Sequence, residues 1–269
     1  MIILKKTLNY QFYDRVINKM NIPFTLTLVS ESSTLITDYL LDQLAFQIEQ
    51  KLQLVEQIFS PFKETSLLKK YQDGDLQALQ NANFKKIFDF AENAFQSTNG
   101  FFDSYYAGKF DPTGLVKGWA IEEIFNNLLL PLFKTNLQIV GISLNGGGDL
   151  QFATRPQCSF CWNIAIENPH QPKHISAVYQ LKTGAIATSG FSKRGNHIAN
   201  MSDTSLIQAT IVAKSLTWAD IWATAALVAG QKNFISLLAK NQLTGIMISP
   251  MTITPFSEGR LANAEKNSI

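Results

Sequence analysis

The chain has 269 residues, enough to bury a sizeable core, with 46% hydrophobic and 16% charged residues. Its 23 basic and 21 acidic residues leave a formal net charge of +2. No basic run interleaves with aromatic residues, so the composition predicts a soluble globular protein and no nucleic-acid partner.

The N-terminal segment from Met1 to Tyr10 has no apolar core of signal-peptide length, and no cysteine near it resembles a lipobox. No window reaches the roughly 18 uncharged apolar residues that a membrane span requires. We therefore expect a cytoplasmic protein without a transmembrane segment.

The first half of the chain predicts one strand and three helices. Residues 24–29 alternate and are rich in β-branched and aromatic side chains, which is typical of a strand. Apolar residues at helical spacing predict a long helix over 34–58, ending before Pro61, and another over 84–95, capped by Asn99-Gly100. A third helix is expected from about residue 116 to residue 129.

The second half is rich in predicted strands. They cover residues 139–144, 150–152, 162–166, 176–181, 185–188, 206–213 and 245–249. A helix that contains Asp220 and ends at Gly230 precedes the last strand, and another covers 234–238. Separate runs of helices and antiparallel strands predict an α+β fold, with one domain over residues 1–269 and an N-terminal extension of about 20 residues.

The segment Trp218-Ala219-Asp220-Ile221-Trp222-Ala223-Thr224 places a carboxylate and a hydroxyl four residues apart where a helix should begin. Side chains at this spacing share one helical face. Two such oxygen donors suit a hard cation such as Mg²⁺. A solvated or capping pair is the alternative for this motif alone.

Two glycine-containing loops could bind phosphate. The three glycines of Asn145-Gly146-Gly147-Gly148-Asp149 either expose backbone N–H groups or form a loose hairpin. Asp111-Pro112-Thr113-Gly114, followed by Lys117, suggests a helix N-terminus that offers N–H groups and a positive charge to phosphate. Taken alone, Asp111 is more simply a cap of the turn.

The remaining polar motifs are less specific. His197 is a surface residue or, beside a phosphate-binding loop, a proton carrier, because an unperturbed imidazole has a pKa of about 6.5. Thr188-Ser189-Gly190 adds hydroxyls after a strand, but no Gly-x-Ser-x-Gly elbow supports a serine hydrolase. Cys158 and Cys161 form a single Cys-x-x-Cys, for which two ordinary thiols are the simpler interpretation than redox or zinc chemistry.

Taken in order, these segments resemble the ApbE family of FAD:protein FMN transferases. The matching segments, from about residue 20 to residue 249, are Met20-Asn21-Ile22, Ser60-Pro61-Phe62 with Ser66, Gly100-Phe101-Phe102-Asp103, Asp111 with Gly114 and Lys117-Gly118, Gly147-Gly148-Asp149, Thr188-Ser189-Gly190, His197-Ile198, and Ala219-Asp220 with Thr224. The resemblance implies a single α+β domain of the ApbE-like (T-fold-related) kind, with antiparallel sheets packed against helices.

The resemblance also implies a reaction. FAD and Mg²⁺ would bind, FMN would be transferred to a Ser or Thr hydroxyl in the flavinylation motif of an acceptor protein, and AMP would be released. The metal would be held by Asp220, Thr224 and backbone oxygens near Gly114 and Ala223. FAD would contact Met20, Phe62, Phe101, Phe102, Asp103, Asp111, Lys117 and Ile198. Asp220 and His197 would be catalytic, with His197 accepting the hydroxyl proton.

The chain departs from the family pattern at three places. Asn200-Met201-Ser202-Asp203 replaces Asp-Pro-x-Thr-Gly after the histidine, Met20-Asn21-Ile22 replaces Met-Gly-Thr, and Phe62 stands where a tyrosine is common. Phe62 could stack on a ring but cannot donate a hydrogen bond. The alternatives to transfer are therefore hydrolysis of FAD to FMN and AMP, and flavin binding without turnover.

Overall fold

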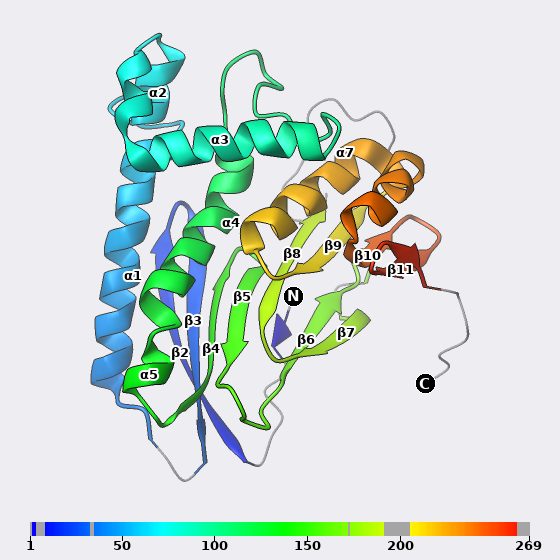
Figure 1. The fold of residues 1–269 in the computed structure, drawn as a ribbon. Coiled ribbons are helices and arrows are strands. Elements are labelled where there is room, and N and C mark those ends of the chain that lie inside the picture. Colours follow the sequence, from blue (N-terminus) through cyan, green and yellow to red (C-terminus); the bar gives the residue numbers. More distant parts are fainter. Residues whose placement is uncertain (1, 4–8, 33–34, 172, 191–204, 263–269) are drawn as a thin grey trace.

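The computed structural model describes residues 2–3, 9–32, 35–171, 173–190 and 205–262. Helices cover one face of a nine-stranded sheet, and a three-stranded sheet packs on the other face (Figure 1). All strand pairs are antiparallel. The α+β fold predicted from the sequence is confirmed.

The helices lie in two groups along the chain. They are α1 (Asp38–Phe59), α2 (Leu67–Gln72), the 3₁₀ helix η1 (Leu76–Gln80), α3 (Ala82–Ser97), α4 (Thr113–Ile124), the π-helical turn η2 (Phe125–Leu129), α5 (Leu132–Thr135) and α7 (Leu216–Asn241). Within the described residues, no helix is both long and apolar enough to cross a membrane.

The large sheet has the strand order β12-β11-β10-β9-β8-β5-β4-β3-β2, and the small sheet has the order β1-β6-β7. The strands are β1 (Ile2–Ile3), β2 (Tyr10–Lys19), β3 (Ile22–Glu31), β4 (Ile139–Gly146), β5 (Asp149–Thr154), β6 (Trp162–Glu167), β7 (Ile175–Leu181), β8 (Gly184–Gly190), β9 (Gln208–Ala213), β10 (Thr244–Ile248), β11 (Ile253–Ser257) and β12 (Arg260–Leu261).

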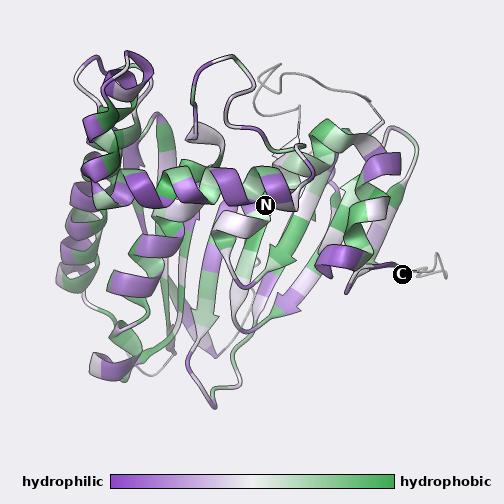
Figure 2. Cartoon of the chain, turned by 45° about the horizontal axis from the view of Figure 1, so that its top comes forward, coloured by the Kyte–Doolittle hydropathy of each residue, from purple (hydrophilic) through white to green (hydrophobic). Residues whose placement is uncertain are grey.

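Two hydrophobic cores lie on the two faces of the large sheet. On β4, Ile142 and Leu144 pack with the helices, whereas Leu150 and Phe152 of β5 pack against Trp162 and its neighbours in the small sheet. Figure 2 shows hydrophobic residues, in green, along strands beneath the helices. Because β4 is covered on both sides, most of its residues are apolar.

Three details differ from or refine the sequence prediction. Residues 10–19, expected within an N-terminal extension, form β2 at the edge of the large sheet. The helix expected from residue 116 begins at Thr113. The predicted helix end at Gly230 is a break inside α7, where Gly230 has φ 69° and ψ 170°.

The glycine-rich loop between β4 and β5 is a tight hairpin. Gly147 and Gly148 have φ values of 63° and 101°, and Gly146 pairs with Asp149 on either side of them. Positive φ at both turn residues is the geometry of two-residue hairpins. Gly146 is buried in β4 and is needed for packing: a Cβ there would lie 2.6 Å from Phe24 and 2.8 Å from Ile121.

We expect Gly146→Ala to destabilise the protein by about 1–3 kcal/mol, because the added methyl would overlap the Phe24 ring and force the surrounding core apart. Urea unfolding followed by circular dichroism measures the change. Ser143→Ala is the matched control on the same strand, since the buried Ser143 hydroxyl has no hydrogen-bond partner within the described structure. Equal stability of the two variants would contradict the packing role of Gly146.

Candidate functional site

The predicted phosphate loop forms the start of α4. Asp111 Oδ1 accepts a hydrogen bond from the Thr113 N–H at 3.0 Å, so this carboxylate, one residue before the N-cap Pro112, satisfies the first N–H of α4. Burial and the Asp111 carboxylate raise the pKa of the neighbouring Tyr106. Gly114 lies in the same turn, where an added Cβ would contact the Phe102 ring at 3.5 Å. The structure thus brings Asp111, Gly114 and the buried Phe102 together.

Lys117 lies one turn further along α4 and is buried between two carboxylates. Its Nζ forms an ion pair with Asp149 Oδ2 and lies 3.6 Å from Asp220 Oδ2. All three residues are buried. The lysine predicted to lie beside phosphates therefore points in this structure at carboxylates from two other elements. Two carboxylates against one ammonium leave a buried net charge of −1.

Asp149 is the residue of this cluster that the sequence did not assign to the site. It opens β5 directly after the Gly147-Gly148 turn and is fully buried. Its second oxygen, Oδ1, accepts a hydrogen bond from the Thr188 N–H of β8 at 3.2 Å. The signal was present in the Gly-Gly-Asp segment, because a carboxylate directly after a hairpin turn is fixed in position by the turn.

Asp220 and Thr224 lie one turn apart on α7, as their spacing predicts. Thr224 Oγ1 is 3.2 Å from Ser189 Oγ of β8, so the predicted Thr-Ser-Gly segment does adjoin the Asp-x-x-x-Thr motif. Ala223, which precedes Thr224 on the same helix, is also buried. Carboxylates of α7 and β5 therefore contact the Lys117 ammonium, and a pair of hydroxyls from α7 and β8 lies one helical turn beyond Asp220.

Gly118 allows α4 and α7 to approach closely enough for this contact. A Cβ at Gly118 would lie 3.1 Å from Asp220 Cβ, 3.1 Å from the Leu216 carbonyl oxygen and 3.2 Å from Asp220 Oδ2. All three distances are shorter than ordinary van der Waals contacts of a Cβ atom. The Lys117-Gly118 pair thus supplies a charge at one position and the space for its partner helix at the next.

The donor atoms of this cluster fit a hard divalent cation. Asp220, Asp149, Thr224 and Ser189 offer oxygen atoms, which Mg²⁺ prefers. Within the described residues there is no group of three or more His, Cys, Asp or Glu side chains that could hold a metal ion. A cation here would therefore depend on hydroxyl, backbone and substrate oxygens in addition to carboxylate.

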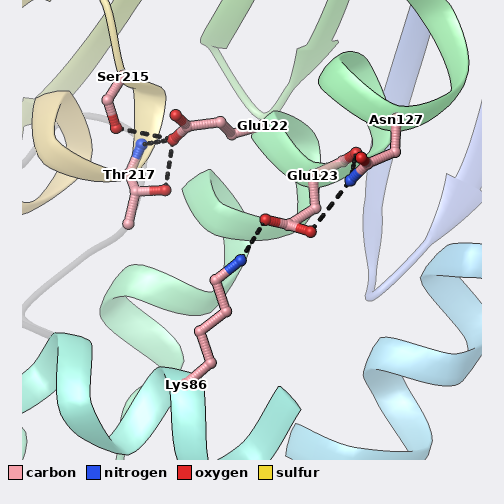
Figure 3. A network of polar contacts seen from close by, with 6 residues as sticks. All are labelled: Lys86, Glu122, Glu123, Asn127, Ser215 and Thr217. Atoms are coloured by element: carbon pink, nitrogen blue, oxygen red, sulfur yellow. Dashed lines mark hydrogen bonds and ion pairs between the residues drawn. The ribbon is translucent and has the colours of Figure 1, made fainter. Parts of the chain in front are cut away.

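Glu122 fixes the start of α7 against α4 (Figure 3). Its Oε2 atom accepts hydrogen bonds from Ser215 Oγ at 2.8 Å, from the Thr217 N–H at 2.8 Å and from Thr217 Oγ1 at 2.5 Å. Ser215 is also the N-cap of α7, accepting from the Trp218 N–H. A carboxylate at a helix N-terminus is stabilised by the free N–H groups and the helix dipole.

The residues that the resemblance places against FAD come from several elements. Phe101 is half-buried on the core, and Asp103 accepts a hydrogen bond from the Tyr105 N–H at 2.7 Å in the same α3–α4 loop. Phe62 follows α1 and is 83% exposed. No contact in the described structure joins Phe62 to the Lys117 cluster, so its part in a flavin site stays a prediction.

Met20 forms the turn between β2 and β3, with a positive φ of 53°. Its N–H donates to Glu56 Oε1 of α1 at 2.8 Å. Partial burial disfavours ionisation of Glu56, but hydrogen bonds from Lys63 and Met20 outweigh it and lower its pKa. Ile22 beyond the turn lies 3.5 Å from the position of a Cβ on Gly147, so the two hairpin turns are neighbours.

Two hollows on the surface lie away from the Lys117 cluster. One surrounds the Met20 turn and includes Glu56. The other is lined by Arg155 and Cys158, among others. Neither hollow is lined by Lys117 or Asp220, so the buried charges, and not these hollows, mark the candidate site.

Two further pairs of residues were singled out in the sequence. His197 and Ile198 fall outside the described residues, and their roles stay predictions. Cys158 and Cys161 are half-buried free thiols. The Phe160 N–H lies 3.4 Å from Cys158 Sγ, and neither thiol approaches the Lys117 cluster in the contacts described.

A family model, that of the ApbE family, matches residues 106–247, which is more than half of the chain. The matched segment contains Asp111, Lys117, Asp149 and Asp220. The chain therefore belongs to the ApbE family. No curated protein matches the sequence significantly.

Solved structures share the fold across nearly the whole chain. An ApbE protein from Thermotoga maritima is 17% identical, with a TM-score of 0.73, and the match covers 91% of this chain and 97% of that one. The flavinyl transferase ApbE from Pseudomonas stutzeri is 13% identical, with a TM-score of 0.70 and coverages of 94% and 97%. The flavin transferase ApbE from Vibrio cholerae is 14% identical, with a TM-score of 0.67 and coverages of 93% and 97%.

We expect Glu122→Ala to destabilise the protein by about 2–3 kcal/mol, because three donors at the start of α7 lose a charged acceptor. The adjacent Glu123 is a matched control: it contacts Lys86 at 2.5 Å and Asn127 at 3.1 Å on the exposed side of the same helix (Figure 3). Exposed pairs of this kind contribute about 0–1 kcal/mol. Chemical denaturation of both variants measures the difference, and similar losses would contradict the anchoring role of Glu122.

Proposed function

We propose that this protein is a flavin transferase, which moves FMN from FAD to a Ser or Thr hydroxyl of an acceptor protein with release of AMP and with Mg²⁺ as its cofactor. The observation that carries the proposal is the buried cluster of Lys117, Asp149 and Asp220 within the matched ApbE segment. The shared fold with flavin transferases from two bacteria supports it.

The reaction needs few protein groups of its own. The acceptor oxygen forms a bond to the FMN phosphorus, the bond from that phosphorus to the AMP oxygen breaks, and AMP leaves with the electron pair. Phosphoryl transfer depends mainly on positioning and on stabilising charge. A bound Mg²⁺ would neutralise developing charge on the phosphate oxygens.

The residues of the chain divide these tasks in our proposal. Asp220 and Thr224 hold the metal, together with backbone oxygens near Gly114 and Ala223. Lys117 pairs with the Asp149 and Asp220 carboxylates and holds Asp220 in position beside the metal. Asp111 and the aromatic residues at 101 and 102 contact FAD. His197 accepts the proton of the attacking hydroxyl.

The direct test incubates the purified protein with FAD and Mg²⁺, with and without a peptide carrying a Ser/Thr flavinylation motif. Chromatography follows AMP, and mass spectrometry follows the peptide. A peptide heavier by one FMN together with free AMP supports transfer. AMP released without the peptide indicates FAD hydrolysis, and FAD that stays bound and unaltered indicates a flavin-binding protein; either result would overturn the proposal.

We expect Asp220→Asn to lower the rate of AMP release by roughly 10²-fold or more, because the metal loses its ionised ligand. The variant should also lose Mg²⁺ binding, measured by calorimetry with FAD present and no acceptor peptide. Asp89→Asn is the control, since Asp89 pairs with Lys85 on the exposed face of α3. An Asp220→Asn protein with unchanged Mg²⁺ affinity would remove Asp220 from the metal site.

A further inference from the structure

The outward face of α1 has an unusual composition. The core side of this helix consists of Leu41, Leu44, Ile48, Leu52, Val55 and Phe59, all buried. At about 100° per residue, the opposite side is a stripe about 120° wide. Its eight members carry no charge and are Tyr39, Gln43, Phe46, Gln47, Gln50, Gln53, Leu54 and Gln57. We call these eight residues the glutamine face.

The apolar members of the glutamine face are well exposed. Tyr39 is 71% exposed, Phe46 62% and Leu54 57%. Gln43 Nε2 donates to the Tyr39 hydroxyl at 2.5 Å, so even the polar contact here joins two members of the face. Single exposed apolar residues are ordinary, but three along one helix with only amides between them form a patch that water solvates poorly.

The charges of α1 lie beside this face and are directed away from it. Asp38 and Asp42 pair with Arg15 of β2 at 2.6 Å and 2.7 Å. Glu49 pairs with Lys19 of β2 at 3.2 Å. These carboxylates on one flank are thus already matched by the neighbouring strand, and Lys51 is the one charge on the opposite rim.

We propose that the glutamine face binds the same face of a second copy of this chain, about a two-fold axis that crosses α1 near its middle. A charged partner would find no opposite charge to pair with. Glutamine amides both donate and accept hydrogen bonds, so the face is complementary to itself. A two-fold contact requires such self-complementarity, and two uncharged faces meet without repulsion.

The size of the face predicts a reversible dimer. At 1.5 Å per residue the 19 residues from Tyr39 to Gln57 span about 28 Å, and a stripe about 10 Å wide covers about 280 Å². Stable interfaces bury roughly 800 Å² per partner. The dimer should therefore form and dissociate with concentration.

The position of α1 keeps this interface separate from the candidate site. In Figure 1, α1 forms one edge of the molecule, with α4 between it and α7. Lys117 and Asp220 lie on α4 and α7, so a second copy on α1 leaves them uncovered. The inference is independent of the proposed flavin chemistry, and either can fail without the other.

Sedimentation velocity over a wide range of protein concentration tests the dimer. We expect the mass to rise from 30.0 kDa toward twice that value. Gln50→Glu preserves side-chain size and should weaken association at least about tenfold, because like charges would face each other across the axis. Gln50→Lys should do the same, and an equal mixture of the two variants should associate again as a heterodimer.

Gln80→Glu is the control, since Gln80 is an exposed glutamine of η1 outside the face. It should associate as the unaltered protein does. Circular dichroism checks that every variant stays folded. The proposal is overturned by a protein that remains monomeric at every concentration, or by a dimer that Gln50→Glu and Gln50→Lys leave unchanged.

Discussion

The structure depends on one buried ammonium group. Lys117 joins three elements, because its Nζ meets Asp149 at the start of β5 and Asp220 on α7. Moving these charges out of water is costly, and Lys117 supplies the one positive charge that offsets the two carboxylates. Removing the lysine would cost about 3–5 kcal/mol, since it would leave both buried carboxylates without a counter-charge. The cluster therefore requires α4, β5 and α7 to keep a fixed geometry.

Several neighbouring residues satisfy that requirement. Gly118 removes the side chain that would separate α4 from α7, and Glu122 holds the first turn of α7 through three hydrogen bonds. The Gly147-Gly148 turn sets where β5 begins and hence where the Asp149 carboxylate lies. These residues have no proposed contact with FAD or the metal, yet they determine the positions of Lys117, Asp149 and Asp220.

The sequence predicted the parts of this arrangement that follow from local periodicity. Asp220 and Thr224 share one helical face because the helix repeat places residues four apart together. The strand β4 was expected because most of its residues are apolar. The edge strand β2 escaped notice, since most of its residues are half-buried and no alternation marks its faces. The ion pair between Lys117 and Asp149 was also missed, because it depends on how a helix crosses a hairpin distant in sequence.

The charge of the cluster has a consequence for the anions that the proposed reaction would bring. Alone, Lys117, Asp149 and Asp220 sum to −1, which would repel a pyrophosphate. A divalent cation on the Asp220 side would change that sum to +1. The cluster with its cation would then present a net positive charge to the phosphates. Because the cluster is buried, this attraction would be stronger than in water. Substrate affinity would therefore depend on the cation, and the lysine by itself could not replace it, because its charge is already balanced by the two aspartates.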